Sequence, residues 1–158
     1  DEHLNKLRAA DREKWHAGFA CDRRAVKAGA ARANRIRAEH SVVRDIAHAA
    51  LAKGATIVLR DEEDSFRRVD DWYDLKVRMH DTEAQTLGLL FPRDAFGPET
   101  TPTRLYLSLV YGNDGPDVVA DWSTRTDSDA DREALEAWFE PIWQRAVAEA
   151  GRKYNIAV

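Results

Sequence analysis

The stretch LYLSLVYGNDGPDVVADW, residues 105–122, constrains the fold more than any other part of the chain. Two apolar runs flank residues 112–116, where Gly and Asn tolerate a positive φ and Pro lacks the N–H that a strand ladder needs. This pattern predicts a β-hairpin. Leu105, Leu107 and Leu109 alternate with less apolar residues, so one face of the first arm is strongly apolar. Because an isolated hairpin is marginally stable in water, we expect other elements to cover that face.

The cover that we expect is a C-terminal helix. Cap-forming and acidic residues at 126–131 precede apolar residues spaced i, i+3, i+4 and i+7 along the chain. Pro141 predicts a bend in this helix, and the continuous apolar face predicts that the helix extends past it. We expect Trp122, Trp138 and Trp143 in the core between hairpin and helix.

Further strands are predicted at residues 56–59, 65–69 and 86–91, where short apolar runs end at turn-forming residues. Ser41 is the predicted N-cap of a separate helix that runs to Lys53 and stops at Gly54. Residues 70–80 alternate as a strand would, but their apolar residues also suit a helix behind a cap at Asp70 and Asp71, so the pattern alone leaves both interpretations open.

These elements predict an α+β fold, an antiparallel sheet of about five strands covered on one face by helices, with a protruding amphipathic N-terminal helix. We divide the chain into a basic amphipathic helical extension, residues 1–40, and an α+β core domain, residues 41–158. A hydrophobic content of 44% excludes a disordered chain, and no apolar run reaches the roughly 20 residues that cross a bilayer. The single Cys excludes an internal disulfide, so we expect a cytoplasmic protein.

Residues 43–123 contain an alanine-rich helix ending in Gly, the strand TIVL, the acidic turn DEED and the segment LSLVYGNDGPDVVADWS. This part of the chain resembles small open reading frames of phages and plasmids of proteobacteria, in which a YGNDG-type turn precedes an acidic residue, two aliphatic residues and an Asp. The resemblance implies a mobile genetic element as the setting and a helix at residues 70–80. It implies no particular activity.

The charge of the chain is divided unevenly along the sequence. Residues 1–53 contain 12 Lys and Arg against 7 Asp and Glu, a net charge of +5, and the remainder contains 12 against 21, a net charge of −9. On the first helix the cations are predicted to lie opposite the apolar residues and to contact nucleic acid. These cations are Arg23, Arg24, Lys27, Arg32, Arg35 and Arg37. A solvated helix face explains the same pattern.

The apolar side of the same helix extends beyond what one small sheet can cover, so we expect it to form a dimer or partner interface. The residues predicted for this interface are Trp15, Phe19, Val26 and Ile36.

Acidic runs at residues 61–64, 70–74 and 127–131 suggest an inhibitor that binds a host protein through an acidic surface, although turns and helix caps explain them equally well. Asp64, Asp74 and Lys76 suggest a Mg²⁺-dependent nuclease, which requires Asp74 and Lys76 on one side of a strand. Residues 127–138 lack the Gly and Glu of a calcium loop. The sequence contains no evident cofactor, metal or small-molecule site. We therefore expect a non-enzymatic binding protein, with the inhibitor and the nuclease as alternatives.

Overall fold

The computed structural model describes residues 29–60, 66–81, 86–109 and 121–156. The chain divides into two compact units, Asp1–Ala33 and Asn34–Val158. Of the first unit, residues 29–33 are described, and they are helical. The second unit holds every described strand.

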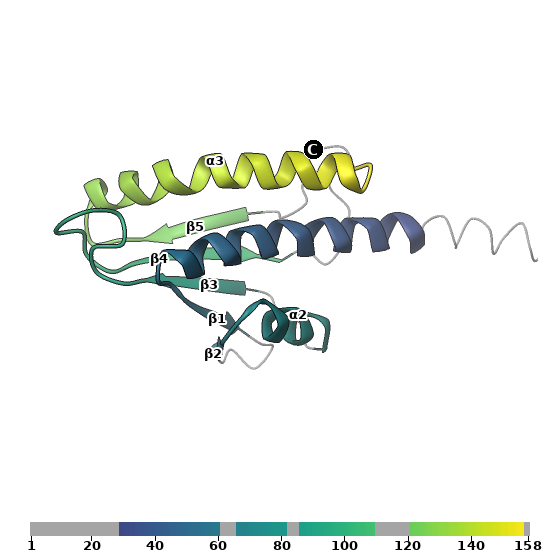
Figure 1. Ribbon diagram of the computed structural model, residues 1–158, viewed down its shortest axis with the longest axis horizontal. Helices are drawn as coiled ribbons and strands as arrows, with labels where there is room; N and C mark the ends of the chain where they lie inside the picture. Colours follow the sequence, from purple (N-terminus) through teal and green to yellow (C-terminus); the bar gives the residue numbers. More distant parts are fainter. Residues whose placement is uncertain (1–28, 61–65, 82–85, 110–120, 157–158) are drawn as a thin grey trace, which may run out of the picture. The chain divides into compact units, whose positions relative to one another are not determined.

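The second unit has an antiparallel sheet of five strands in the order β2-β1-β3-β4-β5 (Figure 1). α3 lies alongside β5, and α2 lies at the β2 end of the sheet. The predicted α+β class is confirmed. The bounds of the elements are β1 (Thr56–Arg60), β2 (Phe66–Val69), α2 (Trp72–Asp81), β3 (Thr86–Phe91), β4 (Thr103–Ser108), β5 (Asp121–Arg125) and α3 (Asp129–Lys153).

The two arms of the predicted hairpin pair as β4 and β5. Leu107 is opposite Trp122 in an antiparallel register, and Ser108 is opposite Asp121. The predicted turn, residues 112–116, lies outside the described residues. The segment at 70–80 is the helix α2, in which Leu75 and Met79, four residues apart, are both buried. Its helical interpretation is confirmed.

A helix over residues 29–52 precedes β1 and continues without a break through Ser41. This differs from the sequence-based expectation of a separate helix that begins at Ser41. Ala38 and Glu39 before Ser41, and Val42 after it, are fully buried. Burial on both sides of Ser41 keeps this segment helical, because tertiary packing outweighs the weak preference of Ser for a helix end. The division between the two compact units falls between residues 33 and 34, within this helix.

One face of the sheet forms the core with the helices. Alternate strand residues on this face are buried together with residues of the helix at 34–52, of α2 and of α3, in a single cluster. The sheet contributes Ile57, Leu59, Val69, Leu87, Leu89, Phe91, Leu105 and Leu107 to it.

Aromatic contacts join α3 to the sheet. Trp122 of β5 packs edge-on against Phe139 of α3, with ring centroids 4.9 Å apart, and Phe139 also contacts Trp143. Trp138 packs edge-on against Phe91 of β3 at 5.3 Å, and the ring of Phe96 in the loop after β3 contacts both. Trp122 therefore packs between hairpin and helix as expected, whereas Trp138 packs against β3 and the loop after it, and all three tryptophans are partly buried. α3 continues through Pro141.

Ser41 and Ser128 provide a matched test of the helix ends. Ser128 is the N-cap of α3, and its hydroxyl accepts a hydrogen bond from the backbone N–H of Asp131 at 3.1 Å. We expect Ser128→Ala to lower the free energy of unfolding by about 1 kcal/mol. Ser41→Ala should leave it unchanged or raise it by a few tenths of a kcal/mol, since Ala is the better residue inside a helix. Urea unfolding of both variants measures this, and a decrease of about 1 kcal/mol in Ser41→Ala would contradict a continuous helix.

Candidate nucleic-acid interface

The predicted site on the N-terminal helix falls largely outside the described residues. Arg23, Arg24 and Lys27 of the expected nucleic-acid face lie outside them, as do Trp15, Phe19 and Val26 of the expected interface. The described members are Arg32, Arg35, Arg37 and Ile36.

Arg35 and Arg37 do not share a face of the helix. At about 100° per residue they lie roughly 200° apart. Arg35 is half-buried and stands three and seven residues before the buried Ala38 and Val42, on the core-facing side of the helix. Arg37 is exposed, and its Nη1 donates to Asn34 Oδ1 at 3.3 Å. The expected single basic face is therefore not formed at these two arginines. Small buried residues such as Ala38 help to define the core-facing side of the helix, on which Arg35 lies. A sequence pattern based only on the larger apolar residues does not identify this side.

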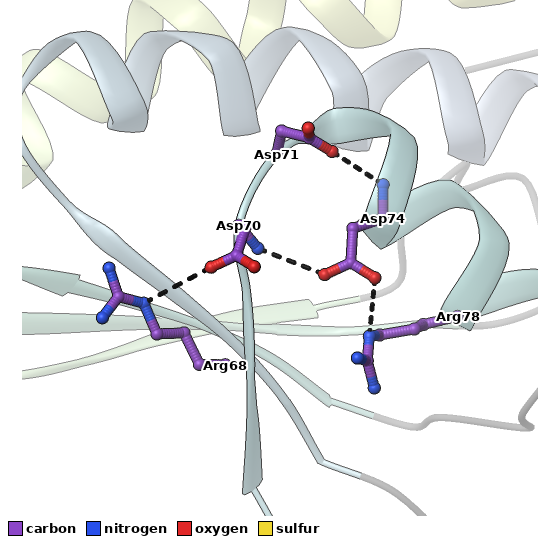
Figure 2. Close-up of polar contacts among 5 residues, drawn as sticks. All are labelled: Arg68, Asp70, Asp71, Asp74 and Arg78. Carbon is purple, nitrogen blue, oxygen red and sulfur yellow. Dashed lines mark hydrogen bonds and ion pairs between the residues drawn. The ribbon is translucent and has the colours of Figure 1, made fainter.

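The acidic run at 70–74 forms the cap of α2 (Figure 2). Asp71 Oδ1 accepts a hydrogen bond from the backbone N–H of Asp74 at 2.8 Å, and Asp74 Oδ2 accepts from the N–H of Asp70 at 3.3 Å. Asp74 Oδ1 also accepts from Arg78 Nε at 2.8 Å, one turn along the helix. The hydrogen bond from Arg78, followed by that from Asp70, lowers the pKa of the Asp74 carboxyl. These acids satisfy the N–H groups that a helix start leaves open.

The nuclease hypothesis required Asp74 and Lys76 on one side of a strand. In α2 their side chains point about 200° apart, and both oxygens of Asp74 accept hydrogen bonds from the protein. Asp64, the other proposed carboxylate, lies outside the described residues. Within the described ranges, no group of three or more His, Cys, Asp or Glu side chains is placed to hold a metal ion.

The acidic run at 127–131 forms the start of α3. Asp131 is buried, and its Oδ2 accepts hydrogen bonds from both the hydroxyl and the backbone N–H of Thr101. These two bonds lower the pKa of the Asp131 carboxyl against the opposing effect of desolvation. Asp131 thereby ties the loop before β4 to the first turn of α3. Residues 61–64, the remaining acidic run, lie outside the described residues.

The second face of the sheet carries a set of residues that the sequence alone does not group. The strand registers place three rows across this face, and among the described residues no helix packs over them. The first row is Arg68, Val58, Gly88, Tyr106 and Ser123. The second row is Phe66, Arg60, Thr86 and Ser108, and it ends at the register position of Asp121. The third row is Thr56, Leu90, Arg104 and Arg125. We call this surface the open face.

Arginines supply the charge of the open face among the side chains that the structure describes. Arg104 and Arg125 are directly opposite each other on β4 and β5, and both are exposed. Arg68 Nε lies 3.8 Å from Asp70 Oδ1, but the two side chains are 73% and 81% exposed, so this ion pair is weak. Arg60 completes the group on β1. The open face therefore has a positive character within a chain of net charge −4.

Two aromatic side chains lie close together on the open face. The rings of Phe66 and Tyr106 are 6.3 Å apart between centroids, although β1 and β3 separate their strands. The guanidinium of Arg125 lies 6.0 Å from the centroid of Tyr106. Gly88 leaves room for this arrangement, since a Cβ there would stand 2.8 Å from Val58 Cγ2 and 3.2 Å from Tyr106 Cε1. The open face thus combines arginines with an aromatic surface.

A shallow hollow of about 590 Å³ continues from the end of β5 to the first turn of α3. Arg125 and Arg132 line it together with Asp127 and Asp129, and Arg132 is paired with Asp129. The positive and negative charges are balanced there, so we assign the hollow no ligand of its own.

Comparison with family models, with curated proteins and with solved structures finds no match for this chain. Of the helices that the structure describes, none combines the length and apolar character needed to cross a membrane. We therefore infer function from the geometry of the site.

Thr101 and Thr103 provide a test of the Asp131 contact. In the folded protein the carboxyl of Asp131 has a lowered pKa, so its contribution to stability is present above the unfolded value of about 4 and disappears as the pH falls through the folded value. Thr101→Val removes the hydroxyl donor. We expect it to raise the pKa of Asp131 and to lower the free energy of unfolding more at neutral than at acidic pH, measured by NMR titration and urea unfolding.

Thr103→Val is the matched control, and its expected change in the free energy of unfolding has the opposite sign. The hydroxyl of Thr103 is buried and finds no hydrogen-bond partner among the described residues. Replacing it by a methyl group should raise the free energy of unfolding by about 1 kcal/mol without altering its pH dependence. An unchanged Asp131 pKa in Thr101→Val would refute the assigned role of that hydroxyl.

Proposed function

We propose that this chain is a non-enzymatic nucleic-acid-binding protein and that the arginines of the open face contact phosphate groups. The observation that carries the proposal is the pairing of Arg104 with Arg125. Like charges directly opposite each other on neighbouring strands destabilise a sheet. A bound polyanion would remove that repulsion, because each guanidinium can donate hydrogen bonds to phosphate oxygens.

The distribution of the remaining charges supports the same proposal. Asp71 and Asp74 are engaged in the cap of α2, and Asp131 is engaged with Thr101. The described acids nearest these helix starts thus contribute hydrogen bonds within the fold, which weakens the alternative of a host-protein inhibitor with an acidic binding surface. The arginines of the open face project from a rigid paired sheet, which holds them at fixed spacing for a repeating anion.

The N-terminal segment supports the proposal, but the proposal does not depend on it. Its net charge of +5 over residues 1–53 would strengthen a sequence-independent attraction to phosphates. Self-association through Trp15, Phe19, Val26 and Ile36 stays a separate proposal, and so does the mobile-element setting. Ile36, the described member of that set, is half-buried.

A double variant, Arg104→Gln with Arg125→Gln, tests the proposal. Binding of labelled single-stranded and duplex oligonucleotides is followed by fluorescence anisotropy across a range of salt concentrations. We expect the variant to bind more weakly, and the slope of log K against log salt to decrease by about 0.7 to 0.9 for each phosphate that the variant no longer neutralises.

The control is Arg145→Gln with Arg152→Gln, which removes the same charge from exposed positions on α3. It should retain the affinity and the salt slope of the parent protein. If the parent binds neither oligonucleotide, or if both double variants weaken binding equally, the open face is not a nucleic-acid site.

A further inference from the structure

Phe66 is an exposed aromatic residue on the open face. Half of its surface is accessible to solvent, and it lies on β2, an edge strand in which Arg67 and Arg68 are also exposed and Val69 is buried. Large exposed apolar side chains that are grouped together mark contact surfaces more often than isolated ones do. Phe66 is grouped with Tyr106, whose ring is 6.3 Å away.

The Tyr106 ring lies against two neighbouring residues, Gly88 and Arg125. Gly88 lies beneath it without a Cβ, so the ring lies close to the backbone of β3. The planes of the Phe66 and Tyr106 rings are inclined at 52°, and the Arg125 guanidinium lies over the Tyr106 ring. The result is an aromatic surface in which Tyr106 is covered by Arg125 and Phe66 remains exposed.

We propose that the open face binds single-stranded nucleic acid, with a base stacked on Phe66 while the arginines contact the backbone. This inference rests on the proposed function and names the class of ligand for that site. Stacking on aromatic side chains requires a free π-face, which single-stranded bases offer and which paired bases in a duplex bury between their neighbours. The combination of stacking residues with cations is the arrangement that single-strand binding uses.

Other occupants fit the open face less well. A second copy of the chain, packed face to face, would bring Arg68, Arg104 and Arg125 against like charges. An acidic polypeptide would satisfy the arginines, but its carboxylates would make no use of the aromatic rings. A nucleic-acid strand satisfies both.

Phe66→Leu tests the stacking step, because Leu keeps an apolar side chain at an exposed position and removes the ring. Tyr73→Leu is the matched control, since Tyr73 is 75% exposed and belongs to α2, not to the strands of the open face. Fluorescence anisotropy measures binding of a labelled single strand, the duplex of the same sequence, an abasic strand of equal length and poly-glutamate. Circular dichroism melting confirms that both variants fold.

We expect the parent protein to bind the single strand more tightly than the duplex, the abasic strand or poly-glutamate. Phe66→Leu should weaken single-strand binding by about tenfold and leave binding to the abasic strand unchanged, since base stacking contributes roughly that factor per base. Tyr73→Leu should bind as the parent does. Equal affinity for duplex or poly-glutamate, or an unchanged affinity of Phe66→Leu for the single strand, would overturn the inference.

These outcomes separate the inference from the proposal on which it rests. Binding to both strand types that disappears in the Arg104→Gln and Arg125→Gln variant, but is indifferent to Phe66, would retain a phosphate-binding face and refute stacking. Absence of binding to every oligonucleotide would refute both.

Discussion

The burial of one face of the sheet is the constraint on which the rest of the structure depends. Side chains alternate between the two faces of a strand, so each residue committed to the core assigns its neighbours to the other face. Leu105 and Leu107 of β4 are fully buried beneath the helices. That burial places Arg104 and Tyr106 on the open face, and the register of β3 places Gly88 beside Tyr106. The candidate site is thus a consequence of how the core is built.

Several acidic side chains lie at the starts of helices, and several arginines lie on the open face. Helix starts leave backbone N–H groups without partners, and carboxylates meet that need in α2, whereas the Ser128 hydroxyl meets it in α3. Asp71 and Asp74 cap the first of these helices, and Asp131 joins the second to Thr101. Arg68, Arg104 and Arg125 lie on the open face. A net charge of −4 for the whole chain therefore conceals a local surface of opposite sign.

The sequence predicts the local elements well because their signals are local. The strand at 86–91 and the pairing of β4 with β5 follow from short-range periodicity and turn residues, and the structure confirms them. The continuity of the helix through Ser41 is not predictable in this way, because it depends on burial of Ala38 and Val42 against other elements. Cap preference at Ser41 is a local property that this packing outweighs.

The open face escapes sequence-based prediction for a related reason. Phe66 and Tyr106 are 40 positions apart in the sequence, and the Arg104 and Arg125 pair is separated by the predicted hairpin turn. Nothing in the local pattern joins them until the strand order and register are known. The hairpin arms nevertheless contain one signal: once Leu105 and Leu107 are assigned to the core, alternation requires Arg104 and Tyr106 to share the opposite face. The alternation of the predicted strand therefore identifies two residues of the site, Arg104 and Tyr106.

Three features of the open face are unfavourable for the stability of the fold, and the packing of the core does not account for them. Arg104 opposite Arg125 introduces repulsion, Phe66 leaves half of its surface in water, and Gly88 gives up the packing that a side chain would provide in a central strand. A surface selected for stability alone would place opposite charges across the strands and polar residues on the edge. All three departures lie on one face, and each favours the same ligand: the arginines suit phosphates, Phe66 suits a base, and Gly88 lets Tyr106 lie close to the sheet. Their coincidence on one surface is the physical reason to expect a nucleic-acid strand bound there.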